Sequence, residues 1–367
     1  MKKVITAIVA LVILGLMAWG YAQSAQHSHH QSEDSKVNPK ETIFEHLGDA
    51  YGWEVPFSHS MRIPLPIIAF AQDGSLHCFL SSRVTSGDTY QDGDATFKLS
   101  TSEEGGYKGK LVQVLGDGSE YRPWDFSITK NVLGILIAAA LVILMAMSLR
   151  KWYKRQGMKA PKGFKGMLEV VIDFVYTDTI KPIMGKEAPK YGPYLLTAFF
   201  FILTMNLLGL IVIFPGGANL TGNLAVTMVL ALITFAVTNL TGTKHYWKEI
   251  FWPDVPMVLK CPVPMMPLIE FLGILTKPLA LMVRLFANML GGHMVVIVLI
   301  LLIMIFAEMF STAVGAGTAV ISVALSVFML VLDTLISFIQ AFVFTLLSTI
   351  FISMAHVHEE EHKVVTE

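Results

Sequence analysis

The sequence predicts an all-α polytopic membrane protein with about five membrane helices, a long tilted C-terminal helical hairpin and a small β-rich extension before the helices. Of the 367 residues, 54% are hydrophobic and only 15% are charged. The mean hydropathy of +0.59 is higher than a soluble domain of ordinary composition reaches. No charged residue occurs between Tyr191 and Thr243, and five occur between Cys261 and Ala355. The net charge of -1 gives no reason to expect a nucleic-acid partner.

Residues 1–25 are predicted to form a signal peptide. Lys2 and Lys3 precede an apolar run of roughly sixteen residues, which is short for a spanning helix, and small residues follow around Ala22–Ala25. An uncleaved N-terminal anchor is the alternative. In both cases residues 26–125 form an exported, periplasmic extension. Turn signals such as DGS and GDG separate its short runs LHCFLSS, ATFKLS and KLVQVL, a pattern that predicts β-structure.

The membrane domain is predicted to cover residues 126–357. Its first span, 131–149, is followed by RKWYKRQGMKAPKGFK, a basic segment that marks the cytoplasmic side by the positive-inside rule. Residues from about 166 to 185 carry too many charges for a span and suit an amphipathic helix at the interface. Spans at 195–214 and 222–240 then cross outward and back. The predicted topology therefore has its N-terminus outside and its C-terminus inside.

A helical hairpin is predicted from about 265 to 355. Apolar sequence runs from about Met265 to Phe306 and from about Thr318 to Ala355, and the second run would form a helix roughly 55 Å long. Because the hydrocarbon core is only about 30 Å thick, both helices are expected to be steeply tilted. STAVGAGT (311–318), with two glycines, is predicted to form the turn. The polar residues 358–367 are predicted to form a cytoplasmic tail.

Polar residues match across this hairpin in one register. When the two helices are antiparallel, with facing residue numbers that sum to roughly 625, Arg284 faces Gln340 and His293 faces Asp333. A charge inside the bilayer costs about 3 kcal/mol or more and indicates function. Arginine stays protonated, so Arg284 can only be a fixed positive charge that favours the ionised form of a carboxylate. The alternative is a positive-inside anchor at the cytoplasmic interface.

His293 and Asp333 can both titrate in a useful range, which favours a proton-handling pair. The alternative is a structural His–Asp bond that holds the hairpin together. Asn288 lies one turn from Arg284 and either orients it or simply packs between helices. Glu270 recurs with Lys277 and Arg284 at seven-residue spacing; it belongs either to a polar entry from the cytoplasm or to an interfacial helix face.

Several motifs resemble subunit a of the F-type ATP synthase. They are RLFANMLGGH, the preceding PLIEF and TKPLAL, MNLLGLIVIFP in an earlier span, and the C-terminal IQAFVFTLLSTIFISMA. The resemblance implies a stator subunit in a bacterial inner membrane that offers two half-channels for H⁺ to a rotor ring of small c-type subunits, beside b-type peripheral-stalk subunits. It also implies that Arg284 separates the half-channels and that Gln340 supports it. Many bacterial members have glutamate at the position of His293 and histidine at that of Asp333, so the pair is swapped here.

Other function classes fit the sequence less well. HEEEH at His358–His362 matches the zinc-protease pattern, but it lies in a polar tail without the packed helix and third ligand that such a metal site needs. GGYKGKL lacks the glycine and Ser/Thr of a phosphate loop. We therefore expect no metal, no cofactor and no catalysis by this chain alone. A self-contained proton-coupled transporter is the alternative function, although the sequence has no internal repeat of the kind that such folds usually show.

Overall fold

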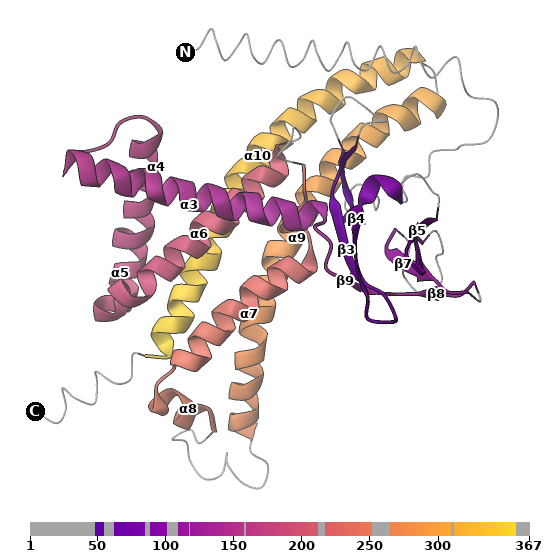
Figure 1. The fold of residues 1–367 in the computed structure, drawn as a ribbon. Coiled ribbons are helices and arrows are strands. Elements are labelled where there is room, and N and C mark those ends of the chain that lie inside the picture. The colour runs from indigo at the N-terminus through magenta and orange to yellow at the C-terminus, as the bar shows by residue number, and fades with distance from the viewer. Residues whose placement is uncertain are drawn as a thin grey trace, which may run out of the picture. The chain divides into compact units, whose positions relative to one another are not determined.

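The structure is a computed structural model that describes nine segments of the chain: residues 48–54, 62–84, 89–100, 109–116, 118–157, 159–211, 217–251, 265–309 and 312–356. Figure 1 shows strands in the first part and long helices in the remainder. The predicted signal peptide, residues 1–25, and the predicted tail, residues 358–367, lie outside the described residues, as does the HEEEH motif.

Within the described residues, five helical segments are long and apolar enough to cross a membrane, in agreement with the expected number. They are Lys130–Gln156, Phe164–Leu210, Leu224–Thr241, Ile269–Ile303 and Gly317–Met354. The first corresponds to α3 (Lys130–Gln156), which is capped by Thr129, whose side chain accepts a hydrogen bond from the Val132 N–H. The chain is therefore a multi-pass membrane protein whose membrane part is helical.

The second segment consists of several helical pieces. They are α4 (Phe164–Val175), a π-helical turn η3 (Tyr176–Ile180), α5 (Lys181–Met184), the 3-10 turn η4 (Gly185–Glu187) and α6 (Ala188–Leu210). The range 166–185, for which one interfacial helix was expected, thus contains α4, η3 and α5. Next come α7 (Leu224–Thr241) and the short α8 (Lys244–Phe251).

The last two helices are α9 (Met265–Met309) and α10 (Thr312–Met354). The predicted turn at 311–318 is wrong, because α10 begins at Thr312 and Gly317 lies inside it. A glycine costs a helix only about 1 kcal/mol. In an apolar environment the helix also satisfies backbone groups that a turn would leave unpaired. The helical hydrogen bonds therefore outweigh the turn preference of the glycines.

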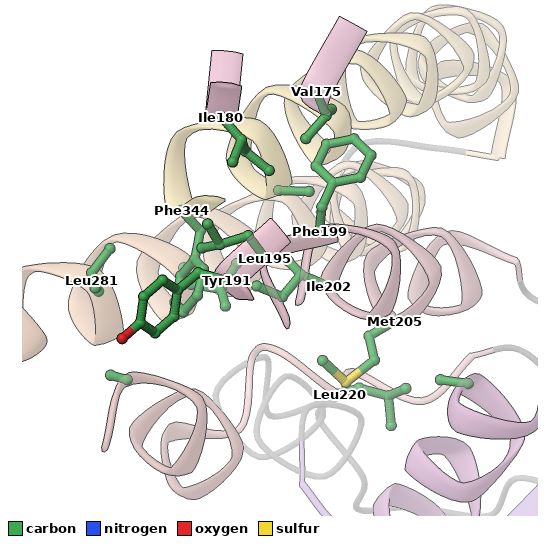
Figure 2. Close-up of a cluster of buried hydrophobic side chains, with 14 of the residues drawn as sticks. Val175, Ile180, Tyr191, Leu195, Phe199, Ile202, Met205, Leu220, Leu281 and Phe344 are labelled. Atoms are coloured by element: carbon green, nitrogen blue, oxygen red, sulfur yellow. The ribbon is translucent and has the colours of Figure 1, made fainter. Parts of the chain in front are cut away.

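The membrane core is built around α6. Leu195, Phe199, Ile202 and Met205 are fully buried, and their spacing places them on one face of the helix. Figure 2 shows this stripe beside Phe344 of α10. Small polar residues let α10 pack closely against its neighbours, since Thr345, Ser348 and Thr349 are fully buried and their hydroxyls donate to carbonyls one turn back. This packing supports α10 from its inner side.

Nine short strands of the described residues form three antiparallel sheets before α3. The first sheet pairs β1 (Gly52–Glu54) with β2 (Arg62–Pro64). The second has the order β4-β3-β9, with β3 (Pro66–Phe70), β4 (Leu76–Leu80) and β9 (Trp124–Asp125). The third has the order β5-β6-β7-β8, with β5 (Tyr90–Asp92), β6 (Ala95–Leu99), β7 (Leu111–Val114) and β8 (Glu120–Tyr121). Strands β4, β6 and β7 coincide with LHCFLSS, ATFKLS and KLVQVL. The turn signals DGS and DGD separate strands here, with Gly74 and Gly93 at positive φ, as tight turns require.

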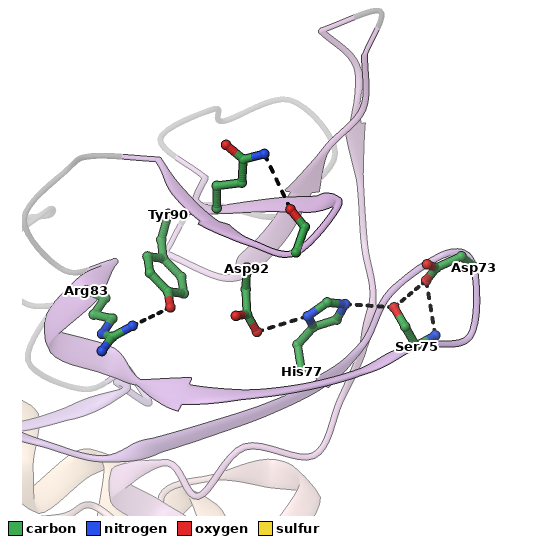
Figure 3. A network of polar contacts seen from close by, with 8 residues as sticks. Asp73, Ser75, His77, Arg83, Tyr90 and Asp92 are labelled. Atoms are coloured by element: carbon green, nitrogen blue, oxygen red, sulfur yellow. Dashed lines mark hydrogen bonds and ion pairs between the residues drawn. The ribbon is translucent and has the colours of Figure 1, made fainter.

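A polar network joins two of these sheets (Figure 3). Nδ1 of His77 on β4 lies 3.0 Å from a carboxylate oxygen of Asp92 on β5, and Nε2 lies 2.7 Å from the Ser75 hydroxyl. The Ser75 hydroxyl also lies 2.6 Å from a carboxylate oxygen of Asp73, and this bond lowers the pKa of Asp73. The His77 ring packs edge-on against Phe97 in the core. His77 therefore connects the two sheets through polar and apolar contacts.

Tyr51 is the main polar contact inside the extension, and its removal should weaken this part of the chain. Its buried hydroxyl donates to the Asp125 carboxylate and accepts a 3.2 Å hydrogen bond from the Leu111 N–H. Burial and the bond to Asp125 raise the pKa of the phenol, so it stays protonated. We expect Tyr51→Phe to cost about 1.5–3 kcal/mol, as for hydrogen bonds to charged groups. Hydrogen exchange of β7 and β9 in the membrane-bound protein measures the loss; Tyr90→Phe, on the exposed side, is the matched control and should change little.

Candidate functional site

Helices α9 and α10 lie close together at Gly292 and Asp333. A Cβ atom placed on Gly292 would lie 2.9 Å from both carboxylate oxygens of Asp333. Asn288, one turn before Gly292, and Ser337, one turn after Asp333, line one pocket with them. Both pairings agree with the antiparallel register that the sequence predicted.

The pocket at this contact brings together three of the predicted site residues. Asn288, His293 and Asp333 line it together with Leu210 at the end of α6. Nε2 of His293 is buried and has no hydrogen-bond partner within the described residues. It points toward α6, since a Cβ atom on Gly209 would lie 3.5 Å from it. Because Gly209 has no side chain, Met289 and the imidazole of His293 can lie close to α6. His293 and Asp333 share the pocket without a hydrogen bond between them in the described residues.

Asn206 on α6 is a buried polar residue that contacts Ser337 behind the pocket lining, and it was not among the predicted residues. Its side chain is only 1% exposed, and its amide nitrogen lies 3.4 Å from the Ser337 carbonyl oxygen. The Thr221 hydroxyl donates to its amide oxygen at 2.7 Å. Asn206 belongs to the MNLLGL motif in a segment without charged residues, where a polar side chain is a functional candidate by default. That signal was present in the sequence, but its connection to Ser337 required the fold.

Arg284 lies outside this pocket, on the exposed side of α9. Ala280, Ala287 and Gly291 are exposed at helical spacing around it, whereas Leu285 is buried. Small residues beside a charged one allow another helix to approach the charge closely. The fixed charge is therefore accessible from outside the chain.

Gln340 lies at nearly the same level of the hairpin as Arg284. Arg284 is eight residues before Gly292 and Gln340 seven residues after Asp333, which corresponds to about 12 and 10.5 Å along the two helix axes. Gln340 is partly exposed. No hydrogen bond joins the two side chains in the part of the chain that the structure describes.

A second pocket, with a mainly apolar lining, lies toward the other end of α9. It is lined by residues of α7, α8, α9 and α10 that include Asn239, Tyr246 and Lys277. The Tyr246 hydroxyl donates to the Asn239 amide oxygen at 3.2 Å. Burial and, next, the negative charge of Glu270 raise the pKa of this phenol. Nζ of Lys277 lies 5.5 Å from the centre of the Phe351 ring. Glu270 and Lys277 thus belong to one polar region, away from the His293 pocket.

The glycine at the helix contact gives a direct test of the first pocket. If the chain transports protons, as its resemblance to subunit a implies, Gly292→Ala should lower that transport about tenfold, because the added Cβ atom would displace the Asp333 carboxylate or separate the helices, at a cost of about 1–3 kcal/mol. ATP-driven acidification of inverted membrane vesicles measures the effect. Gly273→Ala in the same helix is the matched control, since nothing lies within 4 Å of its added Cβ. Equal activity of the two variants would show that Asp333 tolerates displacement.

Among the described residues, no group of three or more His, Cys, Asp or Glu side chains is placed to hold a metal ion. Each pocket contains two titratable groups among amide, hydroxyl and apolar side chains: His293 and Asp333 in the first, and Tyr246 and Lys277 in the second.

Comparison with known proteins supports one assignment. Residues 132–353 match the family described as ATP synthase A chain, and residues 42–126 match a domain of unknown function, DUF8433. The chain is 40% identical over 243 residues to ATP synthase subunit a of Chloroherpeton thalassium, covering 65% of this chain and 69% of the relative. It is 39% identical over 243 residues to the subunit a of Chlorobium phaeobacteroides strain DSM 266 (65% and 67%). It is 40% identical over 249 residues to that of Myxococcus xanthus (65% and 77%).

The family match covers more than half of the chain and includes both pockets and Arg284. The chain therefore belongs to the ATP synthase A chain family, the family of subunit a of the F-type ATP synthases.

Proposed function

We propose that this chain is the proton-translocating stator subunit of a rotary F-type ATP synthase. It offers two half-channels to carboxylates on a rotor ring of c-type subunits, and Arg284 is the fixed charge between them. The observation that carries the proposal is the separation of groups along the hairpin. His293 and Asp333 share one pocket, Lys277 lines another, and Arg284 is exposed on α9 between these positions.

The pocket with His293 and Asp333 belongs to the outer half-channel in this proposal. With the C-terminal tail inside, α9 runs outward, so His293 lies nearer the outer surface than Arg284 does. Protons that enter from outside pass Asn206 and Ser337, reach the His293–Asp333 pair and neutralise a rotor carboxylate. Imidazole and carboxyl groups can both accept and release a proton in this pH range.

The pocket with Lys277 and the nearby Glu270 belongs to the inner half-channel. A rotor carboxylate that arrives beside Arg284 becomes more stable as an anion and releases its proton toward this pocket. Gln340 supports Arg284 from α10, and Asn288 orients it from the next helical turn. Arg284 also blocks a direct proton path between the half-channels because it does not release its own proton.

The chain takes no part in nucleotide chemistry in this proposal, and it works without a cofactor. ATP is made or hydrolysed by partner subunits, while b-type subunits hold the chain still against the ring. The protein resides in a bacterial inner membrane, with residues 26–125 periplasmic after cleavage of the signal peptide 1–25. The basic segment after α3 supports this orientation.

A comparison of the assembled complex with the isolated chain tests the proposal. Inverted vesicles that contain the complex should acidify when ATP is added, and vesicles from cells without this chain should not. Liposomes that contain the purified chain alone should show no proton-coupled uptake of small substrates. Uptake by the isolated chain would replace the stator function with the self-contained transporter, the alternative that the sequence left open.

A further inference from the structure

One face of the sheet β4-β3-β9 is apolar and exposed. Side chains alternate along the strands, so Ile67, Ala69 and Phe79 point into the core, where they are buried. The residues between them point to the opposite face. Trp124 is 72%, Phe126 61% and Leu76 59% exposed. The other exposed members of this face are Phe70, Cys78 and Leu80.

The register aligns these residues in rows across the strands. Phe70 pairs with Leu76 on one side and with Trp124 on the other. Cys78 pairs with Ile68, whose carbonyl accepts a 2.8 Å hydrogen bond from the Phe126 N–H. Both rows are apolar from edge to edge. A contiguous patch of this kind on an otherwise polar domain indicates a contact surface.

The third strand of the sheet leads directly into the first membrane helix. After Phe126, the Ile128 N–H donates to Pro66 at 3.1 Å and the Lys130 N–H to Ala50 at 2.9 Å. These bonds continue to the first residue of α3, so no unbonded linker separates the sheet from the helix. Phe126 and Trp124 precede Lys130 by four and six residues, which limits their Cα distances from it to about 14 and 21 Å.

The chain also bends at this junction. The Thr129 N–H donates to the carbonyl of Ser127, two residues back, at 3.1 Å, as in a three-residue turn. This turn changes the direction of the chain between strand β9 and the start of α3. The sheet is free to lie across the membrane surface instead of projecting straight away from it.

We propose that the apolar face of sheet β4-β3-β9 docks on the boundary between headgroups and acyl chains of the leaflet that α3 enters. Lipid is the favoured occupant because the strand that carries Trp124 and Phe126 leads directly into α3, whose Leu136, Ile143 and Leu144 are exposed as lipid-facing residues are. Tryptophan and phenylalanine are suited to this boundary. The docked sheet would hold the extension beside the outer end of the membrane domain. This inference does not depend on proton translocation.

Photolabelling of native membranes that contain the assembled complex tests the inference. The probe is a phosphatidylcholine with a diazirine near the carboxyl end of one acyl chain, and labelled peptides are identified by mass spectrometry. We expect label on 66–80 and 124–128 at a level comparable with that on α3. Strands β5, β6, β7 and β8 of the third sheet should remain unlabelled.

Two sets of variants control the experiment. Leu76→Glu combined with Phe126→Glu should abolish the label on the sheet and leave that on α3, since both positions are exposed and their change does not disturb the core. Gln91→Glu, on exposed β5, should leave the pattern unchanged. Label on α3 without label on the sheet would overturn the proposal and indicate a protein partner on this face. Equal label on both sheets would overturn it as well, because it indicates random collision with lipid.

Discussion

Arg284→Ala should lower the rate of ATP-driven acidification of inverted vesicles about a hundredfold or more, while the complex still assembles. This is the largest effect that we expect. The positive charge stabilises the ionised form of the rotor carboxylate, and each 1.36 kcal/mol of stabilisation that is lost is a factor of ten in rate. Passive proton leak should rise, because no fixed charge then separates the half-channels. Quenching of a pH-sensitive dye measures both quantities, and the amount of subunit in the membrane confirms assembly.

Two further substitutions decide between this function and an interfacial anchor. Arg284→Lys should also pump poorly, since a lysine can lose its proton in an apolar environment and an arginine does not. Arg150→Ala removes an exposed positive charge from α3, outside both pockets, and should retain most of the pumping. If Arg284→Ala and Arg150→Ala had the same small effect, Arg284 would be only an anchor and the central charge of the proposal would be lost.

His293→Glu should reduce proton pumping about a hundredfold, which is within the usual contribution of a placed acid or base. The variant has two carboxyl groups in one pocket and no imidazole. The double variant His293→Glu with Asp333→His has the arrangement that many bacterial members of the family have at these two positions. It should recover most of the activity, because it again places one acid and one imidazole in the pocket lined by Asn288 and Ser337.

Recovery in the double variant separates a proton-handling pair from a structural one. His293 and Asp333 share a pocket, yet no hydrogen bond joins them within the described residues, so a purely structural bond has no geometric support there. Asp333→Asn preserves the size of the side chain and serves as the control. If it pumped normally, the carboxyl group would not carry protons, and the assignment of this pocket would be wrong.

The site could be predicted from the sequence where its residues lie on the two helices of one hairpin. The contact of Gly292 with Asp333 follows from the length of the apolar runs and the short connection between them, because both are local properties. The position of the turn was predicted less well. Glycines favour turns in water, but in α10 the helical hydrogen bonds of an apolar environment kept Gly317 in the helix.

The residues that complete the pockets depended on helix packing across long stretches of chain. Asn206 forms a hydrogen bond with Ser337, which lies 131 positions later in the chain. The hydropathy of either segment alone does not reveal that the two residues are in contact. In the extension, alternation along LHCFLSS predicted a strand, but which face stayed uncovered depended on where the other sheets packed.

By itself the sequence determined the membrane class, the number of spanning helices, the family and the register of the C-terminal hairpin. Composition, periodicity and short motifs are sufficient for these, since each depends on residues close together in the chain. Only the tertiary structure decided that Ser337 lines the pocket of His293 and contacts Asn206, that Arg284 is exposed, and that the sheet before α3 has an exposed apolar face. These features arise from contacts between distant segments, and such contacts are determined by how whole helices and sheets pack.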